Sequence, residues 1–293
     1  MERRPQNIID AKNALNVLRR NIRMIPIKHY VGLSCINIEL TSNCNKNCWM
    51  CGRRKLEKEH PELCSWGDMN FRLVAKLARE IPRGMMIQFH NNGEPLCYPL
   101  LLEALQIFNG KIRCLNTNGK LLVHKAYELI DNLESLTISV IENDPEGDEQ
   151  YEIVKKFLLL KGKRKPANIV YRLLGNVEKK ERWYELPGRV ATRVLHDPMG
   201  SFDYQRKVTI PEHGICLDLL NHIAINKDGL VSVCVRFDPE KQLVIGDCNN
   251  MPLWKIWNIK KRTDMVKAHL QGRRNELSMC SKCHFYGCPT ANE

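Results

Sequence analysis

Apolar residues along the chain follow two alternating patterns. Six short runs have the β-branched and apolar composition typical of strands, and the runs between them repeat their apolar residues at a helical period. The pattern predicts strands at Cys35–Glu39, Met86–Asn91, Ile112–Thr117, Leu136–Ile141, Asn168–Leu174 and Ala191–His196. It predicts helices at Asn70–Ile81, Pro99–Phe108, Leu121–Leu133, Asp148–Leu160 and Glu178–Leu186, and a leading helix over Asn7–Arg23.

Strands that alternate with helices form parallel βαβ units with right-handed crossovers. Six units predict an α/β fold, a partial (β/α)6 TIM-like barrel that lacks the last two units of a complete one. Several strands carry polar residues on one face, such as Asn37 and Glu39 on the first and Gln88 and His90 on the second. A closed barrel fills its interior with branched apolar side chains. The polar faces therefore predict a wet cavity that holds ligands, unless these groups satisfy one another within the core.

The alternation stops after the sixth strand, where the chain becomes rich in cysteine. The turn sequence Asn226-Lys227-Asp228-Gly229 lies between two apolar runs and predicts a β-hairpin, and residues 253–257 predict a short helix. We therefore expect three parts: an N-terminal helical segment (1–32), a barrel (33–205) and a small cysteine-rich domain (206–293).

Composition places this chain in a reducing compartment. The sequence has 13 cysteines, and it contains neither an apolar run long enough to span a membrane nor a secretory signal pattern at its start. We expect a cytoplasmic protein whose cysteines serve metal or redox chemistry rather than disulfides. The net charge of +12 is scattered in short basic groups, which predicts a solvated surface. Nucleic acid is not the expected partner, and an acidic protein would be attracted equally well.

Three cysteines follow the first predicted strand at a C-x3-C-x2-C spacing: Cys44, Cys48 and Cys51. Thiolates are the standard ligands of iron–sulfur clusters, and three of them leave one iron of a four-iron cluster open. The alternative is a structural zinc site, which needs four ligands and would have to recruit His60 or Cys64.

The spacing, its place after the first strand and the leading T-x-x-C-N resemble the radical S-adenosylmethionine (radical SAM) superfamily. In that family the open iron binds the methionine end of SAM, and an electron from the cluster splits SAM into methionine and a 5′-deoxyadenosyl radical. After the second strand, Asn92, Gly93 and Glu94 resemble the family's Gly-Gly-Glu-Pro segment, which binds the SAM amino group; Asn92 replaces the first glycine. Thr117 and Ser139, on the third and fourth strands, match family positions that contact the ribose or carboxylate of SAM.

The C-terminal cysteines resemble the SPASM/Twitch extension of radical SAM enzymes, which carries auxiliary 4Fe–4S clusters. Six cysteines are present where a two-cluster SPASM form needs about seven, so the resemblance implies one auxiliary 4Fe–4S cluster. Its expected ligands are Cys216, Cys234, Cys280 and Cys283, with Cys288 in reserve. A zinc ribbon built from the same residues is the alternative.

The resemblance implies an enzyme that cleaves SAM and removes a hydrogen atom from a sugar or another small metabolite, for dehydrogenation or epimerisation. Cys248 is the first candidate for a thiol that returns a hydrogen atom, and Cys97 is the second. A maturase of a ribosomally made peptide is the alternative enzyme, and a non-catalytic metal-binding module on nucleic acid is an alternative of another class. The expected partners are a small-molecule or peptide substrate and a reducing protein such as flavodoxin or ferredoxin, with no membrane involved.

Overall fold

One nine-stranded sheet forms the centre of the protein. The computed structural model describes residues 27–193, 195, 216–235, 238, 241–281 and 283, and the predicted leading helix at 7–23 lies outside them. The strand order is β6-β5-β4-β3-β2-β1-β7-β8-β9. The strands are β1 (Cys35–Ile38), β2 (Met86–Phe89), β3 (Ile112–Thr117), β4 (Ser135–Ile141), β5 (Asn168–Leu174), β6 (Arg189–Arg193), β7 (His222–Ile225), β8 (Leu230–Ser232) and β9 (Val244–Asp247).

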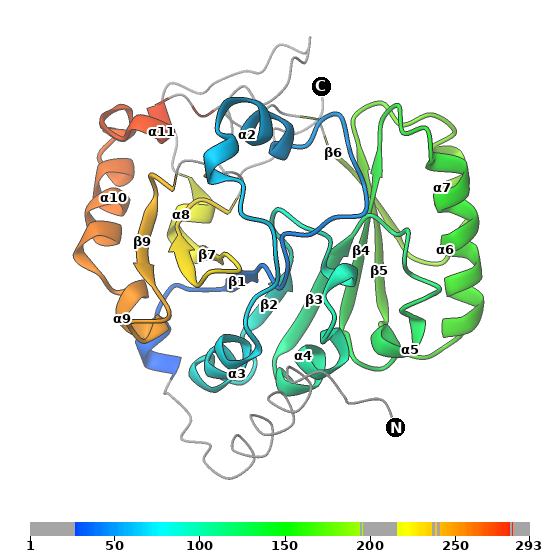
Figure 1. Cartoon of the computed structure of the whole chain (residues 1–293), viewed down its shortest axis with the longest axis horizontal. Coiled ribbons are helices and arrows are strands. Elements are labelled where there is room, and N and C mark those ends of the chain that lie inside the picture. The colour runs from blue at the N-terminus through cyan, green and yellow to red at the C-terminus, as the bar shows by residue number, and fades with distance from the viewer. Residues whose placement is uncertain are drawn as a thin grey trace.

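Strands β1 to β6 are parallel to their neighbours and follow one another in chain order across the sheet. Between them run α2 (Arg53–Glu59), η2 (Pro61–Leu63), α3 (Phe71–Glu80), η3 (Pro95–Cys97), α4 (Leu101–Ile107), α5 (Ala126–Leu129), α6 (Gly147–Lys161) and α7 (Glu181–Tyr184). Figure 1 shows α3 and α4 below the strands, α6 and α7 along one side, and α2 above. The predicted α/β class and the open six-unit barrel are confirmed.

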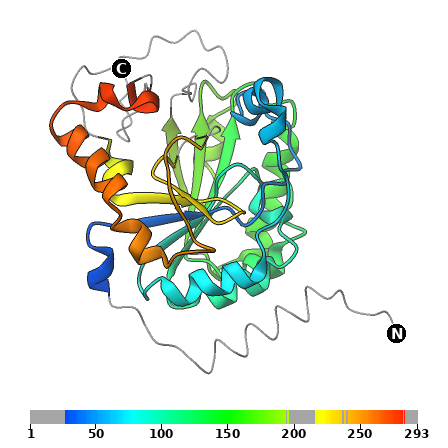
Figure 2. The ribbon, with the colours of Figure 1, turned by 60° about the vertical axis from the view of Figure 1, so that its left-hand side comes forward.

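The C-terminal part continues the same sheet. β7 is parallel to β1, and β8 and β9 add antiparallel strands, so the predicted hairpin is confirmed. The described helices and 3₁₀ turn of this part are α8 (Leu217–Asn221), α9 (Leu253–Trp257), α10 (Lys260–Leu270), η5 (Arg274–Glu276) and α11 (Ser278–Ser281). A further 3₁₀ turn, η1 (Ile27–Tyr30), precedes β1. In Figure 2 the hairpin lies beside β1. The domain boundary at 205/206 stays a prediction.

Two elements differ from their predicted bounds. The helix expected at 121–133 is reduced to α5 (Ala126–Leu129), because positive φ angles at Gly119 and Asp131 turn the chain on either side. The apolar residues that suggested the helix, Leu122 and Leu133, are nevertheless fully buried. The last barrel strand is β6, Arg189–Arg193, which begins two residues and ends three residues earlier than predicted, because its pairing partner β5 ends at Leu174 opposite Arg193.

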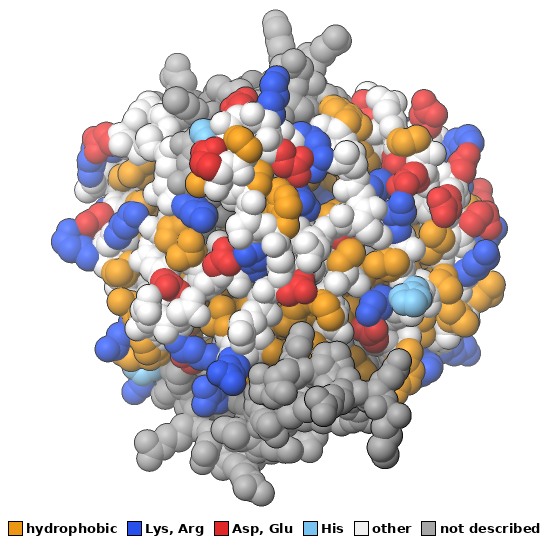
Figure 3. Space-filling view, in the orientation of Figure 1, with side chains coloured by type: hydrophobic (Ala, Val, Ile, Leu, Met, Phe, Trp, Pro, Cys, Tyr) orange, Lys and Arg blue, Asp and Glu red, His pale blue; other side chains and the backbone are white. Residues whose placement is uncertain are grey.

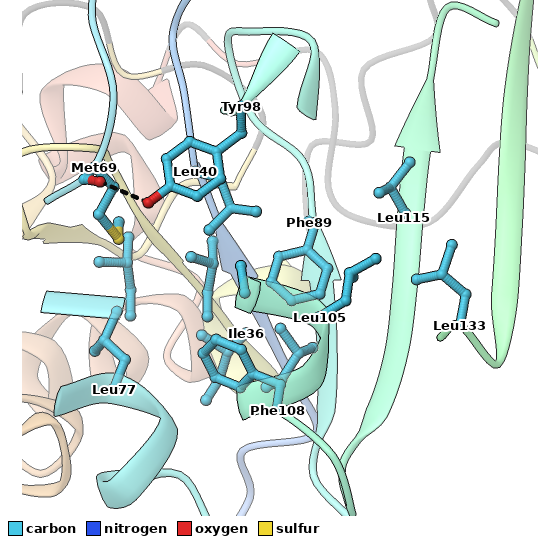
Figure 4. Packing of buried hydrophobic residues seen from close by; sticks show 14 of the residues in the cluster. Ile36, Leu40, Met69, Leu77, Phe89, Tyr98, Leu105, Phe108, Leu115 and Leu133 are labelled. Carbon is cyan, nitrogen blue, oxygen red and sulfur yellow. Dashed lines mark hydrogen bonds between the residues drawn. The ribbon is translucent and has the colours of Figure 1, made fainter. Parts of the chain in front are cut away.

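The apolar core lies on the helix-covered face of the sheet. Ile36, Ile38 and Phe89 are fully buried there, and the Phe89 ring meets that of Phe108, next to α4, edge-on with centroids 5.5 Å apart (Figure 4). A buried Leu or Phe side chain contributes about 1.5–3 kcal/mol relative to exposure. Packing on this side of the sheet therefore holds in place the same strands whose other side carries the polar residues.

The opposite face carries the predicted polar layer. The register places Asn37 beside Gln88, and Gln88 Nε2 donates to Asn116 Oδ1 at 2.6 Å. Asn37 is 5% exposed, and its Oδ1 has no hydrogen-bond partner among the described residues. Gln88 and Asn116 thus satisfy each other within the polar layer, as the alternative to a wet cavity expected, whereas the Asn37 oxygen does not take part.

The surface mixes charges of both signs. On the face in Figure 3, lysine and arginine side chains are interspersed with acidic ones and do not form a single basic patch. No helix in the described ranges is both long and apolar enough to cross a membrane.

Candidate active site

The first cysteine group lies in the loop between β1 and α2. Cys44, Cys48 and Cys51 are all partly buried. Burial, followed by the nearby thiols of Cys51 and Cys44, raises the pKa of Cys48 to about 12. The folded chain therefore holds three thiols close enough to oppose one another's ionisation. Binding of the thiolates to a cationic metal group would offset this repulsion between their charges.

Contacts on two sides anchor this cysteine loop. On one side Arg53, 8% exposed, donates from Nη1 to the Ser42 carbonyl at 2.9 Å and stacks 3.9 Å from the Trp66 ring centroid. On the other side Lys46 forms an ion pair with buried Asp144, and Trp49 Nε1 donates to the Glu142 carbonyl at 3.1 Å. Asp144 and Glu142 follow β4, so the loop spans the open end of the barrel.

The segment after β2 packs directly on the chain that leads into the cysteines. The Glu94 amide donates to the Asn43 carbonyl at 2.8 Å. A Cβ added to Gly93 would lie 2.8 Å from both Ser42 Cα and the Thr41 carbonyl carbon, and closer still to the Thr41 oxygen. Glycine is thus required here by the close approach of two backbones.

Glu94 is buried and fully hydrogen-bonded. Its Oε1 accepts from the Leu96 amide at 3.1 Å and from Thr117 Oγ1 at 2.8 Å, and its Oε2 accepts from the Asn118 amide at 2.7 Å. Burial raises the pKa of Glu94 to about 7, against the opposing effect of these three donors. The carboxyl group therefore joins the segment after β2 to the turn after β3.

Thr117 and Ser139 occupy different environments. The Thr117 hydroxyl donates to Glu94 and accepts from the Gly119 amide at 2.9 Å, so both its roles serve the turn. Ser139 is half-buried and lies opposite Arg172 on the polar face of β4. Asn118 Nδ2 lies 4.0 Å from Cys44 Sγ, so the turn reaches the cysteine loop. Contact of Thr117 and Ser139 with SAM stays a prediction.

Glu39 is a buried site residue that the predicted set lacks. It directly follows β1 and is 4% exposed, and its Oε2 accepts from the Asn92 amide at 3.1 Å and from Asn92 Nδ2 at 3.0 Å. Burial raises the pKa of Glu39, while these donors act in the opposite direction. The available signal was an acidic residue at the end of the first predicted strand, two residues before the T-x-x-C-N sequence.

Three of the predicted auxiliary ligands lie together. Burial, followed by the thiols of Cys216 and Cys283, raises the pKa of Cys280 to about 12. Cys234 follows β8, and its amide donates to Ser232 Oγ. Ser232 Oγ in turn donates to Asp238, whose negative charge also raises the pKa of Cys280. Cys288 lies outside the described residues.

Residues from α10 and η5 hold the backbone of this second group. Arg274, 6% exposed, donates from Nη1 to the carbonyls of Cys280 at 2.7 Å and Cys283 at 3.3 Å. The Cys216 amide donates to His269 Nδ1 at 3.3 Å, and His269 is itself buried. The sequence prediction did not include either residue, because neither belongs to a cysteine motif.

Both groups are built from thiols, the standard ligands of iron–sulfur clusters. All described cysteines are free thiols, so none is lost to a disulfide.

A polar cleft connects the two cysteine regions. It encloses about 760 Å³, its open mouth included, and its wall contains Ser42 and Asn92 near the first group and Cys234 from the second. Glu39, Lys227 and other residues of the hairpin turn complete the wall.

Cys248 lies away from this cleft. It is fully buried at the end of β9, where burial, followed by the nearby Glu80, raises its pKa to about 12. Glu80 belongs to α3, on the helix-covered face of the sheet. Gly246, two residues before Cys248 on β9, also faces α9 on that side. Cys97 instead lies beside the first group, since the charges of Glu94 and Cys44 both act on its thiol.

Comparisons with known proteins agree with this arrangement. Residues 216–284 match SPASM, an iron–sulfur cluster-binding domain. Over 277 residues the chain is 23% identical to an S-adenosyl-L-methionine-dependent 2-deoxy-scyllo-inosamine dehydrogenase of Niallia circulans, covering 89% of this chain and 96% of that protein.

Two solved structures share the fold. BtrN in complex with AdoMet and 2-DOIA has a TM-score of 0.53 at 18% identity, covering 88% of this chain and 95% of that one. Streptococcus suis SuiB bound to precursor peptide SuiA has a TM-score of 0.59 at 14% identity, covering 96% of this chain and 75% of that one. With the cysteine motif, the SPASM match and the shared fold together, the chain is a radical SAM enzyme with a C-terminal SPASM domain.

Proposed function

We propose that this enzyme cleaves SAM reductively and dehydrogenates a small, polar molecule bound in the cleft between its two cysteine groups. The cleft is the observation that carries the proposal. Its wall combines hydrogen-bonding groups such as Ser42 and Asn92 with Cys234 of the second cysteine group, and small-molecule sites are clefts with a few placed polar groups of this kind. Similarity to a SAM-dependent dehydrogenase over nearly the full length of both chains supports the same substrate class.

The proposed ligands of the SAM-cleaving 4Fe–4S cluster are Cys44, Cys48 and Cys51, and those of the auxiliary 4Fe–4S cluster are Cys216, Cys234, Cys280 and Cys283, with Cys288 in reserve. When bound, the first cluster supplies the electron that cleaves SAM. Around it, Lys46 and Arg53 fix the cysteine loop through Asp144 and the Ser42 carbonyl.

SAM is proposed to lie along the ends of β1 to β4. The carbonyls of Asn92 and Gly93 are acceptors suited to an ammonium group. Because the Glu94 carboxyl group already accepts three hydrogen bonds, its proposed part is to shape the turn that carries these carbonyls. Thr117 and Ser139 are proposed to lie near the ribose and carboxylate.

Dehydrogenation fits the placement of the thiols better than epimerisation does. An epimerase must return a hydrogen atom to its substrate, and Cys248 is buried on the helix-covered face, away from the cleft. Cys234 lies in the cleft wall, which brings one proposed auxiliary ligand next to the substrate, where an electron acceptor is needed.

The test is anaerobic reconstitution with iron and sulfide, followed by reduction with dithionite in the presence of SAM and of candidate substrates. We expect release of 5′-deoxyadenosine, and its loss when Cys44, Cys48 and Cys51 are all changed to alanine. The first probe is 2-deoxy-scyllo-inosamine, with other aminocyclitols and polyols beside it. An oxidised product two mass units lighter supports dehydrogenation. Bound zinc without SAM cleavage would refute the proposal.

Two further arms address the alternatives. A product whose mass is unchanged in ordinary water and rises by one unit in deuterium oxide would indicate epimerisation. Short peptides in place of the small molecules test the maturase alternative. Flavodoxin or ferredoxin replaces dithionite in a parallel assay, since either is the proposed physiological reductant.

A further inference from the structure

Asn92 departs from the glycine that its family motif has at this position, and the structure gives the departure a partner. Its side chain and its amide both donate to one oxygen of Glu39, at 3.0 and 3.1 Å. The other oxygen of Glu39 faces the Lys227 amide at 3.5 Å. Glu39 therefore touches the segment after β2 on one side and the hairpin turn of the C-terminal part on the other.

The carbonyl of Asn92 is the group whose position matters. It is the proposed acceptor for the SAM ammonium group, and Arg53 Nη1 approaches it at 3.5 Å, longer than an ordinary hydrogen bond. A glycine at this position would keep only the backbone bond to Glu39 and would give the peptide more freedom to rotate. Two bonds to a buried carboxyl group prevent that rotation.

We propose that Glu39 and Asn92 form a positioning pair, which holds the SAM-binding segment at a fixed place relative to the C-terminal hairpin. The pair is specific to this chain's side chains, because a glycine at position 92 could make only the backbone bond. This inference rests on the proposed SAM site.

The pair also explains how a buried carboxyl group is tolerated directly after β1. Glu39 is 4% exposed, and a buried carboxyl group without partners is costly. Donors from two separate segments make it tolerable, and the bonds from the backbone amides of residues 92 and 227 remain when the Asn92 side chain is removed. Glu39 and Asn92 both line the cleft.

The experiment measures SAM binding by calorimetry on the reconstituted, oxidised enzyme, where no turnover occurs. We expect Asn92→Gly to weaken SAM binding about five- to tenfold, the equivalent of one hydrogen bond. Iron content and the urea midpoint should change little. Asn109→Gly, at an exposed turn, is the matched control for added backbone freedom and should leave SAM affinity unchanged.

A second variant tests the coupling. In a Glu39→Ala background, Asn92→Gly should weaken SAM binding less than twofold further, because the shared bond is already gone. If wild type binds SAM and Asn92→Gly binds it equally well, the positioning pair is refuted while the proposed function stands. If wild type does not bind SAM, both fail. Asn92→Gly alone decides the matter should Glu39→Ala not fold.

Discussion

Replacing Gly93 with alanine tests whether the segment after β2 and the cysteine loop form one packed unit. The new Cβ would lie 2.8 Å from Ser42 Cα and from the Thr41 carbonyl carbon. Unbonded carbon atoms prefer about 3.5–4.0 Å, so one of the two backbones must move by roughly 1 Å. Neither neighbour is a flexible side chain that could rotate away.

The expected cost has two parts. Overpacking of this kind lowers the free energy of unfolding by about 1–3 kcal/mol. The shift also stretches the bond from the Glu94 amide to the Asn43 carbonyl, now 2.8 Å, which adds about 0.5–1.5 kcal/mol. We expect a total loss of about 2–4 kcal/mol and a displaced cysteine loop.

Urea unfolding of the cluster-free protein under anaerobic conditions measures the stability loss, and iron bound after reconstitution measures the effect on the loop. Gly67→Ala is the matched control. Gly67 shares hydrogen bonds with Ser42, yet the nearest atom to its added Cβ is Lys227 Cε at 4.0 Å. That variant should stay within about 0.5 kcal/mol of wild type. A Gly93→Ala protein as stable as the control, with full iron content, would refute the packing argument.

Three further changes probe the groups around the site. Asp144→Asn leaves buried Lys46 with Glu146 as its remaining carboxylate, at 3.3 Å, and should lower the free energy of unfolding by about 1–3 kcal/mol in urea. Glu94→Gln should remove a pH dependence: the raised pKa of about 7 means that wild type is favoured while the group is protonated, and loses stability as the pH rises from 4.5 through 7. The free energy of unfolding of wild type should fall by up to about 1.4 kcal/mol per pH unit in this range. Urea unfolding of wild type and Glu94→Gln at several pH values measures this difference. Arg274→Gln frees the carbonyls of Cys280 and Cys283 and should reduce the iron retained by the C-terminal group, measured with the first three cysteines replaced by alanine.

Each of these has a matched comparison. Asp148→Asn breaks exposed ion pairs with Lys179 and Arg182 and should cost less than about 1 kcal/mol; an equal loss for Asp144→Asn would contradict the buried-pair argument. Parallel pH profiles for wild type and Glu94→Gln would show that Glu94 titrates normally. Arg273→Gln alters a neighbouring, exposed arginine, and equal iron retention in the two arginine variants would remove Arg274 from its assigned part.

The barrel could be predicted because its signals are local. Each strand run in β1 to β5 is bounded by turn residues and lies within a few residues of its observed range. The exceptions needed tertiary information: the helix expected at 121–133 is mostly turn, although its apolar residues are buried as its periodicity implied. The end of β6 is set by its pairing with β5, which a single run of sequence does not reveal.

The site divides in the same way. The cysteine spacings place Cys44, Cys48 and Cys51, and the structure brings Cys216, Cys280 and Cys283 together across more than sixty residues of chain. Residues that act through long-range contacts carry no local motif. Glu39 meets Lys227 from 188 positions away, and Arg274 is one of many basic residues in the sequence. Cys248 follows β9 and is fully buried near Glu80 of α3, and its part as a hydrogen donor stays a prediction.

Strand order explains why the cleft forms where it does. β1 lies between β2 and β7 and is parallel to both, so the ends of all three strands meet at one edge of the sheet. The end of β1 leads to the cysteine loop, that of β2 to Gly93 and Glu94, and that of β7 to the hairpin turn at Lys227. Had β7 joined the free edge at β6 instead, the five strands β2 to β6 would separate β7 from β1, and Cys234 would lie far from the first cysteine group. Pairing with β1 is therefore what places a proposed auxiliary ligand in the same cleft as the proposed SAM site, and Glu39, at the end of the central strand, is the residue in position to contact both neighbours.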